Sequence, residues 1–95
     1  MEKNVINEKF ESDLINILKE IQKMLIEKRH DYGNNYEVIR EKYGEITSLV
    51  RLHDKFNRLE QLIIKNKQPK NESVTDTLFD IIGYAILELM YRKTT

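Results

Sequence analysis

The chain has 95 residues, and its 16 basic and 16 acidic side chains leave no net charge at pH 7. We therefore expect one small domain, and the balanced charge does not favour binding to long nucleic acids or to an anionic membrane. Because the sequence contains no cysteine, disulfides, thiol catalysis and cysteine-based zinc sites are excluded. A polar N-terminus and short apolar runs predict a cytoplasmic protein without a signal peptide or a membrane span.

The first half of the sequence predicts one long helix and one short helix. Apolar residues recur at helical spacing from Ser12, which we expect to cap the first helix, up to Gly33, which suits its C-terminal end. Residues 1–11 would precede this helix as a flexible segment. Residues 36–44 predict a second helix of one or two turns that ends at Gly44.

The second half predicts two more long helices. The third begins near Thr47 or Ser48, and a polar loop with the only proline of the chain follows at residues 66–71. The last helix begins at Ser73, and Asp76 three residues later forms an acidic variant of the capping box. The apolar face predicted for the third helix consists of Leu49, Leu52, Phe56, Leu59 and Ile63. The core face predicted for the last helix consists of Val74, Leu78, Ile81, Ile82, Ala85, Ile86 and Leu89.

These patterns predict an all-α fold, with a single helical domain over residues 1–95 built from three long helices and one short helix. No useful stretch alternates between apolar and polar residues, so strands are not expected. A chain of this size buries only about two thirds of the surface that its unfolded form exposes, so its margin of stability is thin, and self-association is a common remedy. We therefore expect a homo-oligomer.

A row of charged residues lies opposite the apolar face of the third helix. It consists of Arg51, Asp54, Lys55 and Arg58. In one interpretation this is a solvated surface, whose ion pairs each contribute about 0.3 kcal/mol. In the other, two guanidinium groups and an ammonium group hold a phosphate, and Asp54 orients them. Spacing alone does not decide between the two.

The side of the last helix opposite its predicted core mixes acidic and aromatic residues. Its members are Asp76, Asp80, Tyr84, Leu87, Glu88 and Tyr91. Such a mixture favours contact with another helix, another subunit or the ring of a ligand over exposure to water. Asp76 and Asp80 are four residues apart and could jointly hold Mg²⁺. Alternatively, Asp76 caps its helix and Asp80 pairs with a cation of the third helix.

A third polar cluster lies at the end of the first helix. A basic residue such as Lys28 is favourable there for the helix dipole alone. A turn at this point would explain Asp31 and Gly33, but it would not explain the aromatic ring of Tyr32. Tyr32 is therefore a candidate for stacking on a ligand.

Three blocks stand in order along the chain: KRHDYG, RLHDKFNRL and ESVTDTLFDIIGYAIL. This series resembles the nucleotide modification associated domain family, small helical proteins of phages and bacteria, over residues 28–87. The resemblance implies a nucleotide as the class of ligand. It also implies the candidate ligand-binding residues, which are Lys28, Asp31, Tyr32, Arg51, Asp54, Lys55, Arg58, Asp76, Asp80 and Tyr84.

The last block is also distantly similar to the all-α nucleoside triphosphate pyrophosphohydrolases, which hold Mg²⁺ between acidic helices. The sequence departs from their pattern, because Thr77 stands where a glutamate before Asp80 is expected. The acid of the third helix, Asp54, is surrounded by three cations. That composition suits direct contact with phosphate better than a site for several metal ions.

From these residues we expect a nucleotide-binding protein without catalytic residues, bound metal or cofactor. Arg51, Lys55 and Arg58 would hold the phosphate, and Tyr32 or Tyr84 would stack on the base. Through the link of the family to phages, the ligand would be a nucleotide or cyclic nucleotide that signals host immunity. The protein would sequester it in the host cytoplasm without turnover.

Two other classes of function stay open. One is an enzyme, either a Mg²⁺-dependent nucleoside triphosphate pyrophosphohydrolase that uses Asp54, Asp76 and Asp80 or an accessory enzyme of nucleotide modification. The other is a structural helical oligomer without a small ligand, in which the tyrosines form contacts between subunits.

Overall fold

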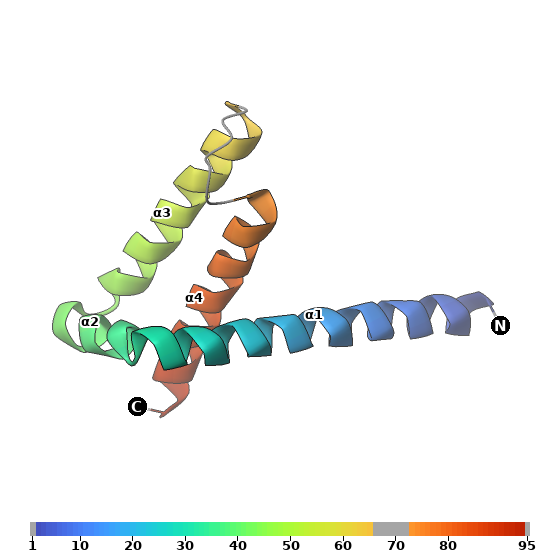
Figure 1. Cartoon of the computed structure of the whole chain (residues 1–95), viewed down its shortest axis with the longest axis horizontal. Coiled ribbons are helices and arrows are strands. Elements are labelled where there is room, and N and C mark those ends of the chain that lie inside the picture. Colours follow the sequence, from blue (N-terminus) through green and yellow to red (C-terminus); the bar gives the residue numbers. More distant parts are fainter. Residues whose placement is uncertain (1, 66–72, 95) are drawn as a thin grey trace. The chain divides into compact units, whose positions relative to one another are not determined.

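The computed structural model describes residues 2–65 and 73–94, and every regular element in these ranges is a helix (Figure 1). The elements are α1 (Glu2–Tyr32), α2 (Asn35–Tyr43), α3 (Ile46–Ile63) and α4 (Val74–Thr94). The chain divides into two compact units, Met1–Gly33 with α1 and Asn34–Thr95 with the other three helices. The prediction of an all-α fold with three long helices and one short helix is confirmed.

Helix α1 begins at Glu2, so the prediction that Ser12 caps this helix is wrong. Neither glycine nor proline precedes Ser12, and nothing else in that stretch of sequence interrupts a helix. Lys9 and Asp13 form an ion pair of 2.7 Å across the predicted boundary, one helical turn apart. The predicted end is confirmed, because Gly33 has a φ of 66° and donates its N–H to the carbonyl of Arg29 at 2.8 Å.

Two residues, Gly44 and Glu45, separate the short helix α2 from α3. Gly44 has a φ of 80°, and its N–H donates to the carbonyl of Arg40 at 2.9 Å, which ends α2 where the sequence predicts. Helix α3 begins at Ile46, one residue before the predicted start. The hydroxyl of Thr47 then donates to the carbonyl of Ile39 at 3.3 Å, which ties the first turn of α3 to α2.

The start of α4 has the capping box that the sequence predicts. The N–H of Asp76 donates to the hydroxyl oxygen of Ser73 at 3.1 Å, and the N–H of Ser73 donates to the Asp76 carboxylate at 3.2 Å. The predicted loop at residues 66–71 lies outside the described residues. At the other end of the helix, Arg92 and Lys93 stand in the last turn, where basic side chains complement the helix dipole.

Helices α3 and α4 run antiparallel within their unit (Figure 1). Lys55 of α3 pairs with Asp80 of α4 at 3.0 Å. Glu45, ten residues before Lys55, pairs with Arg92, twelve residues after Asp80, at 2.8 Å, as expected for two antiparallel helices. Thr77 is fully buried on α4, and it is small enough to let the helices approach closely. Its hydroxyl donates to the carbonyl of its own helix at Ser73, at 2.9 Å, so the burial leaves no unsatisfied polar group.

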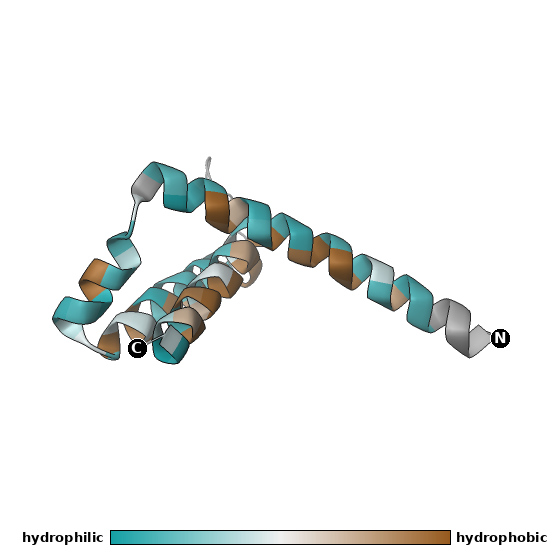
Figure 2. Cartoon of the chain, turned by 90° about the horizontal axis from the view of Figure 1, so that it is seen from below, coloured by the Kyte–Doolittle hydropathy of each residue, from teal (hydrophilic) through white to brown (hydrophobic). Residues whose placement is uncertain are grey.

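The predicted core faces of α3 and α4 are wrong for six of their apolar residues. These side chains stay between 37% and 61% exposed, and they are Leu49, Phe56, Ile63, Leu78, Ile82 and Leu89. The structure instead turns the acidic and aromatic side of α4 inward, where Glu88 is buried and Tyr84 is half-buried. The reason is that α2 and α3 supply charged and hydroxyl partners for that side, so its polar groups are satisfied. Figure 2 shows hydrophobic residues along α3 and α4 and along α1.

None of the helices within the described residues is both long enough and apolar enough to span a lipid bilayer.

Candidate functional site

Four of the predicted ligand residues lie half-buried where α3 meets α4, and we call this group the polar seam. Its members are Arg51 and Lys55 on α3 and Asp80 and Tyr84 on α4. Lys55 and Asp80 form an ion pair of 3.0 Å, in which 17% of each side chain is exposed. A pair so far withdrawn from water interacts more strongly than one on an open surface. The interpretation of Asp80 as the partner of an α3 cation is thus confirmed.

Two tyrosine rings meet beside the polar seam. The centroids of the Tyr84 and Tyr36 rings lie 6.2 Å apart, and the ring planes are tilted by 35°. Tyr36 is buried, and its hydroxyl donates to the carboxylate of Glu88 at 2.8 Å. Burial, followed by this hydrogen bond, raises the pKa of Tyr36 well above its usual value, while the charge of Arg51 acts in the opposite direction. Arg51 therefore acts electrostatically on the Tyr36 hydroxyl.

The other predicted residues of α3 and α4 are exposed. Asp76 has its carboxylate engaged in the cap of α4, which confirms the interpretation of this residue as a helix cap. Asp54 has no hydrogen bond or ion pair to Arg51 or Arg58 within the described part of the chain. The role of Asp54 as the residue that orients these cations stays a prediction.

The first unit holds the remaining three predicted residues. Lys28 and Asp31 are exposed near the C-terminal end of α1, and the Asp31 carboxylate lies 3.4 Å from Nδ1 of His30. Tyr32 is the last residue of the helix, and its side chain lies outside the described part of the structure.

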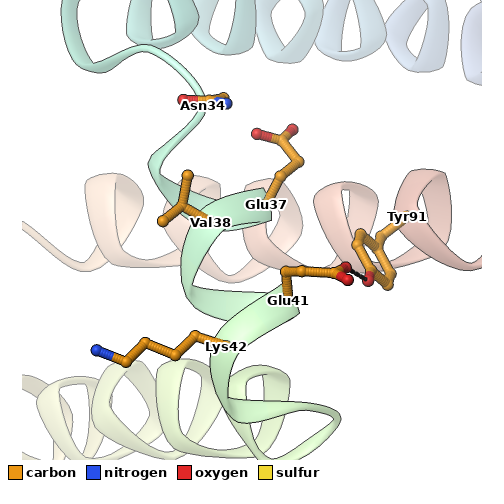
Figure 3. Close-up of a pocket in the computed structure, with 6 residues that line it drawn as sticks. All are labelled: Asn34, Glu37, Val38, Glu41, Lys42 and Tyr91. Atoms are coloured by element: carbon orange, nitrogen blue, oxygen red, sulfur yellow. Dashed lines mark hydrogen bonds between the residues drawn. The ribbon is translucent and has the colours of Figure 1, made fainter.

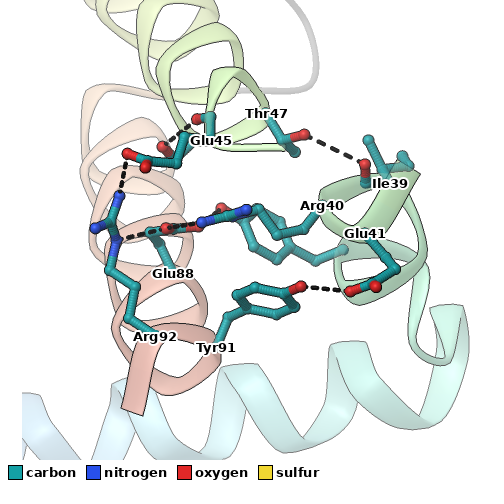
Figure 4. A network of polar contacts seen from close by, with 10 residues as sticks. Ile39, Arg40, Glu41, Glu45, Thr47, Glu88, Tyr91 and Arg92 are labelled. Atoms are coloured by element: carbon teal, nitrogen blue, oxygen red, sulfur yellow. Dashed lines mark hydrogen bonds and ion pairs between the residues drawn. The ribbon is translucent and has the colours of Figure 1, made fainter. Parts of the chain in front are cut away.

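A buried carboxylate, Glu88, ties α4 to α2, and the sequence interpretation did not single it out as a site residue (Figure 4). It accepts a hydrogen bond from the Tyr36 hydroxyl at 2.8 Å. Nε and Nη2 of Arg40 donate to its two oxygens at 2.9 and 3.1 Å, in the paired geometry typical of arginine and carboxylate. Arg92 lies one turn after Glu88 on α4, and its Nε donates to the Glu88 carboxylate at 2.6 Å. We call these four residues the Glu88 network.

The electrostatics of the Glu88 network keep its carboxylate ionised. The hydrogen bonds from Arg40 lower the pKa of Glu88 to about 2, and those from Tyr36 and Arg92 act in the same direction. Burial opposes this shift but does not outweigh it. At neutral pH the network therefore holds a full negative charge against two guanidinium groups.

The Glu88 network continues outward at both arginines. Nη2 of Arg92 reaches Glu45, the residue just before α3, at 2.8 Å. The guanidinium of Arg40 lies 4.5 Å from the centroid of the Tyr91 ring, within the range of a cation–π contact. The Tyr91 hydroxyl in turn donates to the carboxylate of Glu41. Polar contacts thus connect α2, the start of α3 and the last turns of α4.

One signal in the sequence did point to this region. The mixture of acids and tyrosines on α4 predicts contact with another helix, another subunit or a ligand, and the structure places α2 and α3 against that side. The partners themselves were missed, because Tyr36 and Arg40 lie on the short helix and precede Glu88 by 52 and 48 residues.

A pocket of about 460 Å³ borders Tyr91 on the side of α2 (Figure 3). It is lined by Asn34, Glu37, Val38, Glu41, Lys42 and Tyr91. Two carboxylates against one ammonium group make this pocket a poor place for a phosphate. None of the ten residues that match the family pattern lines it, and the cations of the polar seam suit an anion better.

Metal ligands do not converge in the described residues: no group of three or more histidine, aspartate or glutamate side chains is placed to hold an ion. Asp76 and Asp80, the pair considered for Mg²⁺, are instead engaged by Ser73 and Lys55.

Comparison with known proteins places this region in a family. The model of the family described as nucleotide modification associated domain 1 matches residues 28–91. The matched range covers all ten predicted site residues and the Glu88 network except Arg92. No curated protein and no solved structure matches the chain. The resemblance to the all-α nucleoside triphosphate pyrophosphohydrolases receives no support from these comparisons.

Proposed function

This chain belongs to the nucleotide modification associated domain 1 family, and we propose that it binds a nucleotide along the polar seam. The observation that carries the proposal is the position of Arg51, Lys55 and Tyr84, which lie half-buried where α3 meets α4. Two cationic groups and an aromatic ring are the side chains that a phosphate and a base require.

The phosphate would contact the two cations of the polar seam. A guanidinium offers paired donors to phosphate oxygens, and an ammonium offers three donors, so Lys55 can keep its contact with Asp80 while it binds an anion. Both groups are partly withdrawn from water, where attraction to an anion is stronger than on an open surface. Arg58, exposed one turn further along α3, would extend the row of cations.

The base would stack on Tyr84, whose ring is held on one side by its contact with Tyr36. Tyr36 is itself fixed by its hydrogen bond to Glu88, so the Glu88 network would support the stacking surface from behind. Asp54 and Asp76 would contact ribose or base at the edge of the polar seam, and the roles of Lys28, Asp31 and Tyr32 of the first unit stay separate predictions.

We further propose binding without turnover. Asp76 and Asp80, which a Mg²⁺-dependent hydrolase would use as ligands, have other partners at the helix cap and in the ion pair. In its narrowest form the proposal is that a phage protein sequesters a linear or cyclic nucleotide that signals host immunity. This form extends from the resemblance of the sequence to the family.

A binding panel tests the proposed function. The purified chain would be titrated calorimetrically with linear and cyclic nucleotides, with and without Mg²⁺, and the ligand recovered afterwards for mass spectrometry. We expect at least one nucleotide to bind without Mg²⁺ and to be recovered intact. Metal-dependent formation of a product would instead indicate an enzyme, and the absence of binding to every nucleotide would favour a structural protein.

The variant Arg51→Ala tests the position of the site. Loss of a charged donor to phosphate should weaken binding about tenfold or more. The matched control is Lys19→Ala, which removes an exposed cation of α1 outside the range that matches the family. Equal affinities of Arg51→Ala, Lys19→Ala and the natural chain would place the nucleotide elsewhere.

A further inference from the structure

Nine large apolar residues of α3 and α4 are exposed, and we call six of them, the ones that the sequence predicts as core, the apolar face. Its members are Leu49, Phe56, Ile63, Leu78, Ile82 and Leu89. We propose that two copies of this chain associate through the apolar face, so that the two helix pairs form a four-helix bundle. This interface is independent of the proposed nucleotide site.

The six residues lie on the same side of the helix pair. Lys55 faces α4, because it pairs with Asp80, and it serves as the reference direction on α3. At about 100° per residue, Phe56 lies about 100° around the helix from Lys55, and Leu49 and Ile63 lie within about 20° of Phe56. On α4, Leu78, Leu89 and Ile82 lie about 120°, 140° and 160° from Tyr84 in the same rotational sense. The two helices are antiparallel. Residues rotated in the same sense from the facing side of each helix therefore lie on one side of the pair, and this holds for the apolar residues of α3 and of α4.

The size of the apolar face suits a small dimer. From the exposed fractions of its six side chains, the face offers roughly 600 Å² per chain, so two copies would bury roughly 1,200 Å². That area is the lower end for specific and stable association of proteins. An open apolar patch of this size is also at the upper end of what soluble monomers expose.

Two arguments favour a second copy as the partner. The matched range 28–91 includes the whole apolar face but not the apolar residues of α1 from Phe10 to Ile26, so the face belongs to the domain that defines the family. A partner that is present wherever this domain is present is a second copy of the same chain. An antiparallel helix pair with one open apolar side is also half of a four-helix bundle, and a two-fold axis would supply the matching half.

The interface would leave the cationic row of α3 accessible. Arg58 lies about 60° from Lys55 in the opposite sense to Phe56, so it stands on the other side of the helix pair. Loss of association therefore need not abolish nucleotide binding, and failure of the nucleotide proposal would not affect this one.

Cross-linking gives a direct test, because the natural chain contains no cysteine. Single cysteines would be introduced as Leu49→Cys, Phe56→Cys and Ile82→Cys, with Asp54→Cys on the other side of α3 as the control. We expect a short bis-maleimide to give covalent dimers with at least one of the first three variants and none with the control. Dimers from the control alone, or from none of the four, would overturn the proposal.

The mass of the 95-residue chain in solution gives a second readout. Light scattering after gel filtration should report a dimer for the natural chain, and Phe56→Glu should raise its dissociation constant at least about thirtyfold. A monomer at about 100 µM would overturn the proposal. Should Phe56→Glu fail to fold, as judged by circular dichroism, the cross-linking result decides.

Discussion

At the scale of single residues, the side chain of Glu88 accepts four hydrogen bonds. Its carboxylate accepts hydrogen bonds from Tyr36 and Arg40 on α2 and from Arg92 on α4. Removing one partner of such a buried ion pair is costly, because the remaining charges lose their compensation while they stay out of water. The attachment of α2 to α4 therefore depends strongly on one acidic residue.

The stability of the protein should depend on pH through Glu88. Its pKa of about 2 in the folded chain lies below its ordinary value of 4.5, so the unfolded chain takes up the proton first as the pH falls. The stabilisation by this carboxylate is complete above about pH 5 and is lost between pH 4.5 and 2. We expect Glu88→Gln to lower the free energy of unfolding by about 2 kcal/mol at pH 7 and by much less near pH 2.5.

Urea unfolding followed by circular dichroism at pH 7, 5, 3.5 and 2.5 measures this difference. The other acidic groups are the same in Glu88→Gln and in the natural chain, so their contributions cancel in the difference between the two free energies of unfolding. Glu20→Gln, on the exposed surface of α1, serves as the matched control and should follow the natural chain at every pH. A gap between Glu88→Gln and the natural chain that stays constant with pH would contradict the assignment.

At the scale of the helix, two serines show what a capping pattern can and cannot predict. Ser73 follows a polar, proline-containing stretch of sequence and makes the predicted cap, whereas Ser12 follows residues that continue the helix without interruption. A capping residue marks a start only where the preceding sequence cannot be helical. The same reasoning locates the two C-terminal ends at Gly33 and Gly44, where a positive φ requires glycine.

Substitution of the two serines should therefore have different effects. Ser73→Ala removes the acceptor for the Asp76 N–H and should lower the free energy of unfolding by about 1 kcal/mol. Ser12→Ala places a better helix former inside α1 and should leave stability unchanged or slightly raised. Thermal unfolding of both variants, monitored by circular dichroism, distinguishes these outcomes. A loss of stability in Ser12→Ala as large as that in Ser73→Ala would argue that both serines are caps.

The sequence was sufficient for the helices but not for the side that each one buries. Periodicity identifies an apolar side of α4 through Leu78, Ile82 and Leu89, and it is silent on which partner covers that side. The polar seam could be predicted only in part, because periodicity does not show which helices pack together. Arg51, Lys55, Asp80 and Tyr84 could be named from spacing, but their shared position depends on the antiparallel pairing of α3 and α4.

At the scale of the whole molecule, only three large hydrophobic residues, Ile21, Tyr36 and Leu62, are buried among the described residues. That is a small core for a chain of 95 residues, and it explains why an open apolar face matters. Ion pairs and hydrogen bonds specify how the second unit is arranged, yet their net contribution to its stability is modest. We therefore expect association to supply part of the stability.

A dependence of stability on protein concentration follows from this. For a dimer, the thermal midpoint rises with concentration by mass action, and we expect an increase of several degrees between about 5 and 200 µM. Phe56→Glu should show a lower midpoint that does not change over the same range. Differential scanning calorimetry at four concentrations measures both. Equal midpoints at all concentrations in the natural chain would mean that folding does not depend on association.

The arrangement around Glu88 also has a consequence for how related sequences diverge. Loss of the acid would leave three donors without their acceptor at once, whereas loss of Tyr36, Arg40 or Arg92 would leave two donors in place. Evolution should therefore retain an acidic residue at position 88 while the donors are exchanged one at a time. Where position 88 does become apolar, positions 36 and 40 should have changed with it, as correlated substitutions between two helices.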